Sequence, residues 1–156
     1  MIQNLIIIKD GSTLLSEDFG ECHSLHSNPI LLSGFFDALM SFSEEFEQGS
    51  LEQLRFKNAN VNFLKSNGLL YVIVTDLEDN LTVNTTKLNK IAQLFYRGYG
   101  KFLSNFSGEI TSFDKFKDTI LELGIAQKNC GNHKECSDCQ NSAKNNPILD
   151  EIMKLM

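Results

Sequence analysis

The chain opens with a continuous apolar segment that predicts a buried strand. Residues Ile2 to Ile8 are apolar on both faces and rich in β-branched side chains, which is typical of a central strand. Asp10-Gly11 follows and predicts a tight hairpin turn, so Leu14 to Phe19 is the expected returning strand. A second apolar run, Leu69 to Val74, predicts another buried strand, and the hairpin signal Asn67-Gly68 precedes it.

A long apolar helix is predicted between the two strand regions. Asn28-Pro29 is a favourable helix start, and apolar residues at helical spacing predict a helix that runs to about Gln48 and ends at Gly49. This helix is apolar around much of its circumference, so we expect a second surface to cover it besides the sheet. Gly34 and Ala38, four residues apart, are expected on the side next to the sheet.

Weaker patterns complete the order of elements. Residues 51–58 and 60–65 alternate between apolar and polar positions and predict two more strands. Thr85 or Thr86 is expected to cap a second long helix, whose apolar stripe extends to Phe106. Residues 112–123 predict a third helix with Phe113, Phe116, Ile120 and Leu123 facing inward. The resulting order, strand, strand, helix, three strands, helix, helix, predicts an α+β fold.

Composition restricts the classes of protein that this chain can belong to. A length of 156 residues with 42% hydrophobic residues, including 12 Phe, predicts one domain with a substantial core. The formal net charge of −6 argues against a general nucleic-acid binder, which needs a basic face. No apolar run reaches the roughly 18 residues of a membrane span, and no signal peptide is evident. We therefore expect a cytoplasmic protein, which a partner could hold at a membrane surface.

The composition changes after Ala126, which predicts a domain over residues 1–126 and a tail over residues 127–156. The tail is polar and rich in Asn, Lys and Cys, and Pro147 opens a short amphipathic helix at its end. The polar face of that helix lacks the basic residues that anionic lipids attract, so we expect it to dock on protein.

One constellation in the tail has ligand chemistry. Cys130, His133, Cys136 and Cys139 follow the spacing C-x2-H-x2-C-x2-C, and three thiolates with one imidazole suit tetrahedral zinc. Ligands at this spacing would spiral around a helix, so the segment must be a loop to bring them together. Because cytoplasmic thiols stay reduced, a metal is favoured over disulfides.

Other interpretations of these residues stay open. The tail could carry no ligand, and Cys136 with Cys139 could form a disulfide or redox pair. Compact cysteine runs also bind iron–sulfur clusters, to which Cys22, His23 or His26 could contribute a remote ligand.

No catalytic arrangement is evident elsewhere in the sequence. Cys22 and His23 are adjacent in sequence, which does not make them a catalytic dyad. Residues 97–101 resemble a phosphate-binding loop superficially, but they lie in a helical stripe and lack the G-x4-G-K-[ST] spacing. We therefore expect no enzyme activity.

The predicted order of elements resembles the longin fold. The residues that carry this resemblance lie in Leu5 to Gly11, in Leu32 to Leu39 with Phe42, in Leu69 to Asp76, and in Phe95 to Phe102. In detail the chain is most similar to longin-like proteins of archaea related to eukaryotes. The roadblock and profilin-like folds have a related architecture, but the strand order and the two C-terminal helices favour longin.

This resemblance implies a five-stranded antiparallel sheet with one helix on one face and two on the other. It also implies a non-catalytic module that forms homodimers or heterodimers, often through a sheet edge or the first helix. The expected partner is a small GTPase, another longin or roadblock-type domain, or a vesicle-trafficking assembly. The sequence contains no coiled coil or C-terminal anchor of the fusion proteins, so we do not expect that role. The alternative is a redox or regulatory protein that uses the Cys cluster to bind zinc or an iron–sulfur cluster.

Overall fold

The computed structural model describes residues 1–20, 28–46 and 49–128. The elements in these residues follow the predicted order. They are β1 (Ile2–Lys9), β2 (Ser12–Asp18), α1 (Pro29–Glu44), β3 (Gln53–Arg55), β4 (Asn60–Ser66), β5 (Leu69–Thr75), α2 (Leu81–Leu103), the 3₁₀ turn η1 (Thr111–Phe113) and α3 (Phe116–Glu122).

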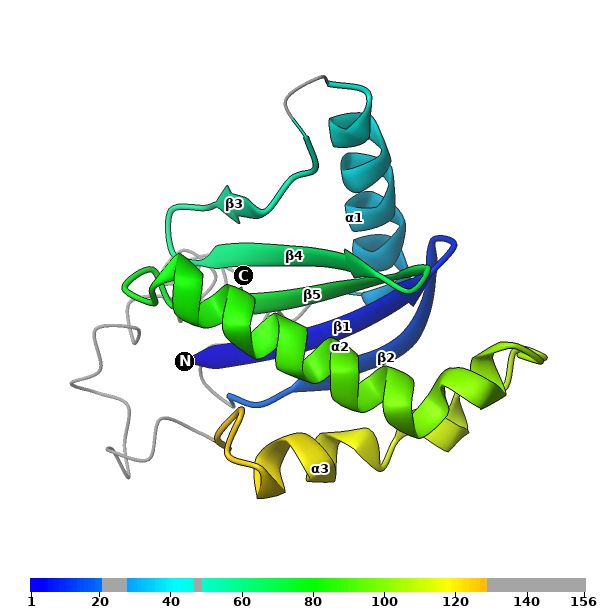
Figure 1. Ribbon diagram of the computed structural model, residues 1–156. Helices are drawn as coiled ribbons and strands as arrows, with labels where there is room; N and C mark the ends of the chain where they lie inside the picture. Colours follow the sequence, from blue (N-terminus) through cyan, green and yellow to red (C-terminus); the bar gives the residue numbers. More distant parts are fainter. Residues whose placement is uncertain (21–27, 47–48, 129–156) are drawn as a thin grey trace, which may run out of the picture.

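The five strands form one antiparallel sheet in the order β2-β1-β5-β4-β3 (Figure 1). Both apolar runs are interior strands, as predicted, and all seven residues of β5 are buried. Each predicted hairpin turn is present. Asp10 and Gly11 have φ angles of 48° and 76°, and Asn67 and Gly68 have φ angles of 52° and 74°. These left-handed conformations suit Gly, Asn and Asp, and they match the twist of the two strands that each turn joins.

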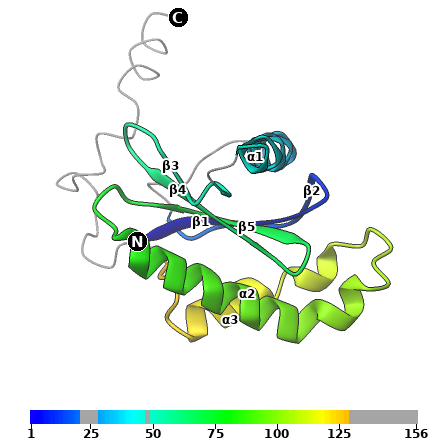
Figure 2. The same ribbon diagram turned by 45° about the horizontal axis from the view of Figure 1, so that its top comes forward.

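Helix α1 lies on one face of the sheet, and α2 and α3 lie on the other (Figure 2). The alternation of side chains along β1 divides the core accordingly. Ile6 and Ile8 pack with Phe36 and Met40 of α1, whereas Leu5 and Ile7 belong to the core beneath α2 and α3. This arrangement confirms the predicted fold class: the chain has a longin-like α+β fold.

A buried polar contact attaches α2 to the sheet. The side-chain amides of Asn84 in α2 and Asn62 in β4 both donate to the hydroxyl oxygen of Thr75, each over 3.1 Å. Because all three side chains are buried, these hydrogen bonds fix the position of α2 above the end of β5.

Two helix boundaries differ from the predictions. Helix α1 ends at Glu44, before the predicted Gln48, because the backbone N–H groups of Glu45 and Phe46 bond back to residues three positions earlier. Helix α2 begins at Leu81, and Asn80 caps it by accepting from the backbone N–H of Thr82. The predicted caps Thr85 and Thr86 lie inside the helix, so that prediction is wrong.

Two predictions about helix faces are also wrong. Gly34 and Ala38 lie on the exposed side of α1, and Ser33 is the small residue that faces the sheet. Leu123 follows α3 as its C-terminal cap and is 54% exposed, whereas the other three residues predicted to face inward are buried.

No helix in the described residues is long and apolar enough to cross a membrane. The last residue of the described core is Ala126. The domain boundary that we placed after this residue stays a prediction.

Candidate functional site

The predicted metal ligands lie outside the described residues. This applies to Cys130, His133, Cys136 and Cys139, and also to the loop residues Cys22, His23 and His26. Within residues 1–20, 28–46 and 49–128, no group of three or more His, Cys, Asp or Glu side chains is placed to hold a metal ion. Zinc binding by the tail therefore stays a prediction.

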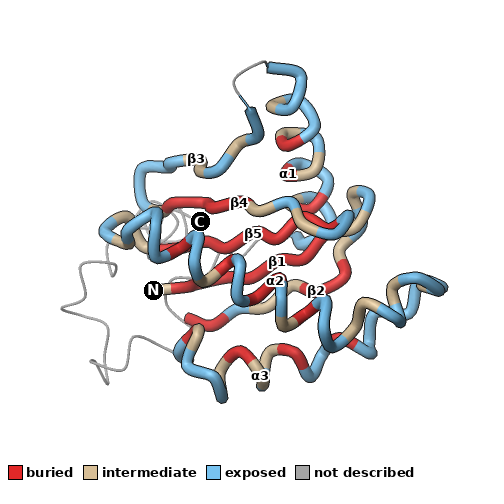
Figure 3. The backbone as a smooth tube through the Cα atoms, in the orientation of Figure 1, coloured by how far each residue is buried: buried red, intermediate tan, exposed pale blue. Residues whose placement is uncertain are grey.

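The most unusual surface of the described residues is the outer side of α1. Five large apolar side chains are more than half exposed there or at the ends of the helix, with exposed fractions from 52% to 74%: Ile30, Leu31, Phe35, Phe42 and Phe46. Figure 3 shows the same contrast along α1, which is mostly pale blue with short red segments. We call these five residues, together with Gly34 and Ala38, the α1 outer face.

The sequence pattern of α1 explains why one sheet cannot cover it. Ser33, Phe36 and Met40 are buried against the sheet at spacings of three and four residues. Leu31, Phe35, Ala38 and Phe42 repeat the same spacing on the opposite side. The helix therefore has two apolar stripes, and the sheet buries only one of them.

Small and large residues alternate on the α1 outer face. A Cβ atom added at Gly34 would meet nothing within 4 Å, so the backbone is open to approach there. The rings of Phe42 and Phe46 contact edge to face, with centroids 5.0 Å apart. The face thus combines small residues at Gly34 and Ala38 with larger exposed side chains, a combination that lets a facing helix approach closely.

The charged residues of α1 itself are all acidic. Helix α1 contains Asp37 and Glu44 but no basic residue. Glu44 is paired with Lys65 of β4, whose ammonium nitrogen lies 2.7 Å from one carboxylate oxygen. That ion pair lies at the end of the helix, so the α1 outer face itself is apolar with no charge at its centre.

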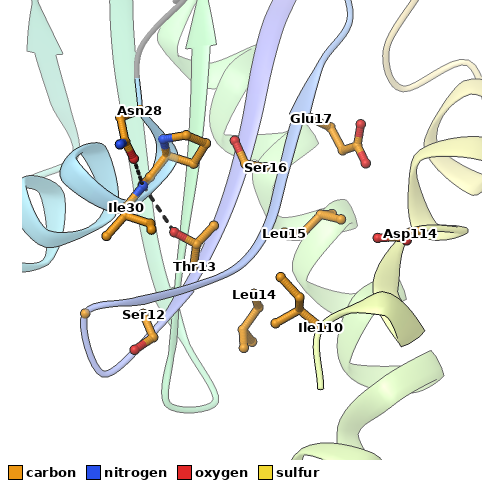
Figure 4. Close-up of a pocket in the computed structure, with 12 residues that line it drawn as sticks. Ser12, Thr13, Leu14, Leu15, Ser16, Glu17, Asn28, Ile30, Ile110 and Asp114 are labelled. Carbon is orange, nitrogen blue, oxygen red and sulfur yellow. Dashed lines mark hydrogen bonds between the residues drawn. The ribbon is translucent and has the colours of Figure 1, made fainter. Parts of the chain in front are cut away.

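A groove lies next to this surface, at the open edge of the sheet. It has a volume of about 610 Å³ and is lined by β2, the start of α1, and the segment that contains Ile110 and Asp114 (Figure 4). Strand β2 pairs only with β1, so its outer edge has no strand partner among the described residues. Two exposed isoleucines, Ile30 and Ile110, flank the groove, which makes it continuous with the α1 outer face through Ile30.

The start of α1 is held against β2 by hydrogen bonds. The side-chain oxygen of Asn28 accepts from the backbone N–H of Ile30 over 2.9 Å. The Thr13 hydroxyl donates to the carbonyl of Pro29 over 3.1 Å and lies 2.6 Å from the Ser33 hydroxyl oxygen. These contacts fix the groove and the first turn of α1 as one surface.

The perturbed titratable groups do not form a reactive site. Burial raises the pKa of Tyr71 and of Tyr99 above the ordinary tyrosine value. Both rings belong to an aromatic cluster around Phe95 beneath α2, where Tyr71 is fully buried. The raised pKa values are therefore a consequence of core packing.

Comparison with known proteins adds little to this picture. No protein-family model matches the chain, and no curated protein matches it. Among solved structures, the chain is similar to MglB from Myxococcus xanthus, with a TM-score of 0.45 and 8% sequence identity over 62% of this chain and 78% of that chain. We draw no functional conclusion from so distant a likeness.

Sequence reasoning anticipated the α1 outer face only in part. The wide apolar circumference of the helix predicted a second buried surface, but Phe35, Phe36 and Phe42 were not separated into core and surface. Phe36 is buried, whereas Phe35 and Phe42 are exposed. Ser33, on the opposite side of the helix from Phe35, is the signal that could have distinguished the buried Phe36 from the exposed Phe35 and Phe42. A hydroxyl that faces the sheet needs a hydrogen-bond partner, and Thr13 supplies it.

Proposed function

We propose that this chain is a non-catalytic protein-interaction module that dimerises through the α1 outer face. The observation that carries the proposal is the group of five large apolar side chains on α1 and just after it that the sheet does not cover. Exposed apolar patches of this kind usually mark interaction surfaces.

A second copy of the chain is the occupant that we propose for this surface. Five large side chains, each more than half exposed, present on the order of 500 Å² of apolar area, against about 800 Å² for each partner in a stable interface. The small residues Gly34 and Ala38 would leave room for a projecting Phe of a copy related by a two-fold axis. In an antiparallel pair, the acidic end of one α1 also meets the positive N-terminal end of the other.

The resemblance to longin proteins suggests which further partner the dimer would bind. A longin-like dimer would scaffold a small GTPase, another longin or roadblock-type domain, or a trafficking-type assembly. The groove at the β2 edge supports this role, because it remains available beside α1 for an extended segment of such a partner.

Self-association can be tested by measuring the mass of the chain in solution. Native mass spectrometry or light scattering at micromolar concentration should give a dimer for the wild type and a monomer for Phe42→Asp. Phe56→Asp is the matched control, since Phe56 is 49% exposed but lies between β3 and β4. A monomeric wild type, or equal effects of the two substitutions, would overturn the dimer through α1.

Partner binding needs a separate measurement. Purified small GTPases of the source organism, loaded with GDP or with a GTP analogue, should bind the wild type in a titration. If no GTPase binds in either nucleotide state, the GTPase role is wrong even where the dimer is present.

A further inference from the structure

Helix α2 is basic, whereas the whole chain is acidic. The 23 residues of this helix include four basic residues and no Asp or Glu. The chain as a whole has a net charge of −6. The basic residues of α2 are Lys87, Lys90, Arg97 and Lys101.

These four cations are aligned on the helix. At about 100° per residue, Lys90, Arg97 and Lys101 project within roughly 40° of one another, and Lys87 lies beside them. The first three are exposed, and Lys87 is half-buried. The ion pairs of the described residues use other cations, namely the N-terminal ammonium, Lys9, Lys65 and Lys117. The row from Lys87 to Lys101 therefore presents unpaired charge of one sign over about 21 Å.

The row lies on the side of α2 that faces away from the sheet. None of its residues lines the groove at the β2 edge, and none lines the shallow cavity between the end of α1 and β3. An occupant of either of these two cavities would not meet these side chains. The row instead suits a broad anionic surface that contacts the molecule from one side.

We infer that the outer side of α2 docks on an anionic lipid bilayer. A bilayer carries laterally continuous negative charge, so a row of cations can meet it without a shaped pocket, and each Lys or Arg near such a surface raises binding about five-fold. Exposed Val83 lies in line with the cations on the helix, within roughly 40° of all three. An aliphatic side chain on the docking side adds buried apolar area to the electrostatic attraction.

A nucleic acid suits the surface less well than a bilayer. All acidic residues of the chain lie outside α2, and charges more than about 10 Å apart are screened at 0.1 M salt. A planar bilayer meets only the basic side, whereas a long polyanion that followed the surface would also meet acidic side chains. The position of α1 on the opposite face of the sheet keeps the α1 outer face free while α2 is docked (Figure 2).

The test is sedimentation of the full chain with vesicles of defined composition. The wild type should sediment with vesicles of 30% phosphatidylserine in phosphatidylcholine at low salt. It should not sediment with pure phosphatidylcholine vesicles, and 0.5 M NaCl should release it. The triple variant Lys90→Gln, Arg97→Gln, Lys101→Gln should lose about 100-fold in partitioning.

The matched control removes the same number of charges elsewhere. Arg55, Lys57 and Lys115 are exposed basic residues outside α2, and replacing all three by Gln should change partitioning by no more than a few-fold. Equal losses in the two triple variants would overturn the inference, since net charge alone would then explain binding. Failure of the wild type to bind anionic vesicles would overturn it, as would tighter binding to a DNA duplex than to the vesicles at the same salt. None of these outcomes depends on the dimer proposed above, because α1 is unchanged in every variant.

Discussion

At the scale of single residues, the hydroxyl of Thr75 is the acceptor on which the placement of α2 depends. It receives the amide hydrogens of Asn62 and Asn84 in a fully buried site. Thr75→Val keeps the shape of the side chain but leaves two buried amides without this acceptor. We expect the free energy of unfolding to fall by about 1–3 kcal/mol in denaturant titrations.

The control for this substitution is Thr86→Val on the exposed side of α2. The Thr86 hydroxyl donates only to the carbonyl of Thr82, one turn earlier. A change within about 0.5 kcal/mol is expected there. If Thr75→Val were equally mild, the buried contact would not be what holds α2 to the sheet.

A second residue-scale prediction concerns the hydroxyl of Tyr71, which is buried and has no hydrogen-bond partner in the described residues. Burial raises the pKa of Tyr71 in the folded protein, with a smaller contribution from Tyr96. Above pH 10 the unfolded chain therefore releases this proton more readily than the folded one. Stability that is fully present below pH 10 should then fall as pH rises, by up to about 1.4 kcal/mol per pH unit.

Tyr71→Phe removes this contribution to the pH dependence. The variant should lose less stability than the wild type between pH 9 and pH 11, as measured by urea titrations. Between pH 6 and pH 8 the two proteins should have the same slope, which serves as the internal control. At pH 7 the variant should be as stable as the wild type or more so, because the hydroxyl that is removed has no partner. Equal alkaline slopes would contradict the role assigned to Tyr71.

At the scale of elements, the start of α2 gives a direct test of helix capping. The side chain of Asn80 accepts from the backbone N–H groups of Thr82 and Val83, at 2.8 and 3.4 Å. Asn80→Ala should lower the free energy of unfolding by about 1 kcal/mol. Thr85→Ala is the informative comparison and should cost less than about 0.5 kcal/mol, because Thr85 lies inside the helix. A larger loss of stability in Thr85→Ala than in Asn80→Ala would indicate that Thr85 caps the helix, as the sequence predicted.

Hydrophobic pattern and turn chemistry predicted the elements that local sequence determines. The two hairpins follow from Asp10-Gly11 and Asn67-Gly68, and the start of α1 follows from Asn28-Pro29. The first turns of α2 were missed because residues 76–84 are polar and resemble a connection. They are helical because Asn80 caps them and Asn84 reaches a buried partner, and that partner, Thr75, lies in a strand. The start of α2 thus depends on a contact between the helix and a strand. The hydrophobic pattern of the helix segment alone cannot predict such a contact.

The sequence predicted the α1 outer face only in part. An excess of apolar residues on α1 is visible in the sequence, whereas the side that the sheet covers depends on how α1 approaches β2. Thr13 on β2 pairs with Ser33, which rotates Gly34 and Ala38 to the outside. The predicted use of Gly34 and Ala38 failed for this reason. The charge row on α2 was also visible in the sequence, but its alignment on one exposed side required the helix to be placed.

At the scale of the whole molecule, the sheet separates two surfaces of different chemistry. The α1 outer face is apolar and lies on one side, and the basic row of α2 lies on the other (Figure 2). The two surfaces can therefore be occupied at the same time. In a dimer related by a two-fold axis through α1, the basic rows of the two copies would point away from each other.

The tail provides the last prediction, because the domain boundary that we placed after Ala126 implies that the domain folds without it. Every residue of the two described cores lies between Ile2 and Ala126. Deletion of residues 129–156 should therefore leave the free energy of unfolding within about 1 kcal/mol of the full chain.

All three His and all four Cys lie outside the described residues, so any zinc held by Cys and His ligands must be held there. Native mass spectrometry of protein purified without oxygen or chelator should detect one zinc per full-length chain and none in the truncated chain or in Cys136→Ser. Zinc retained by Cys136→Ser would exclude the predicted ligand set, and unfolding of the truncated chain would place the domain boundary beyond residue 126.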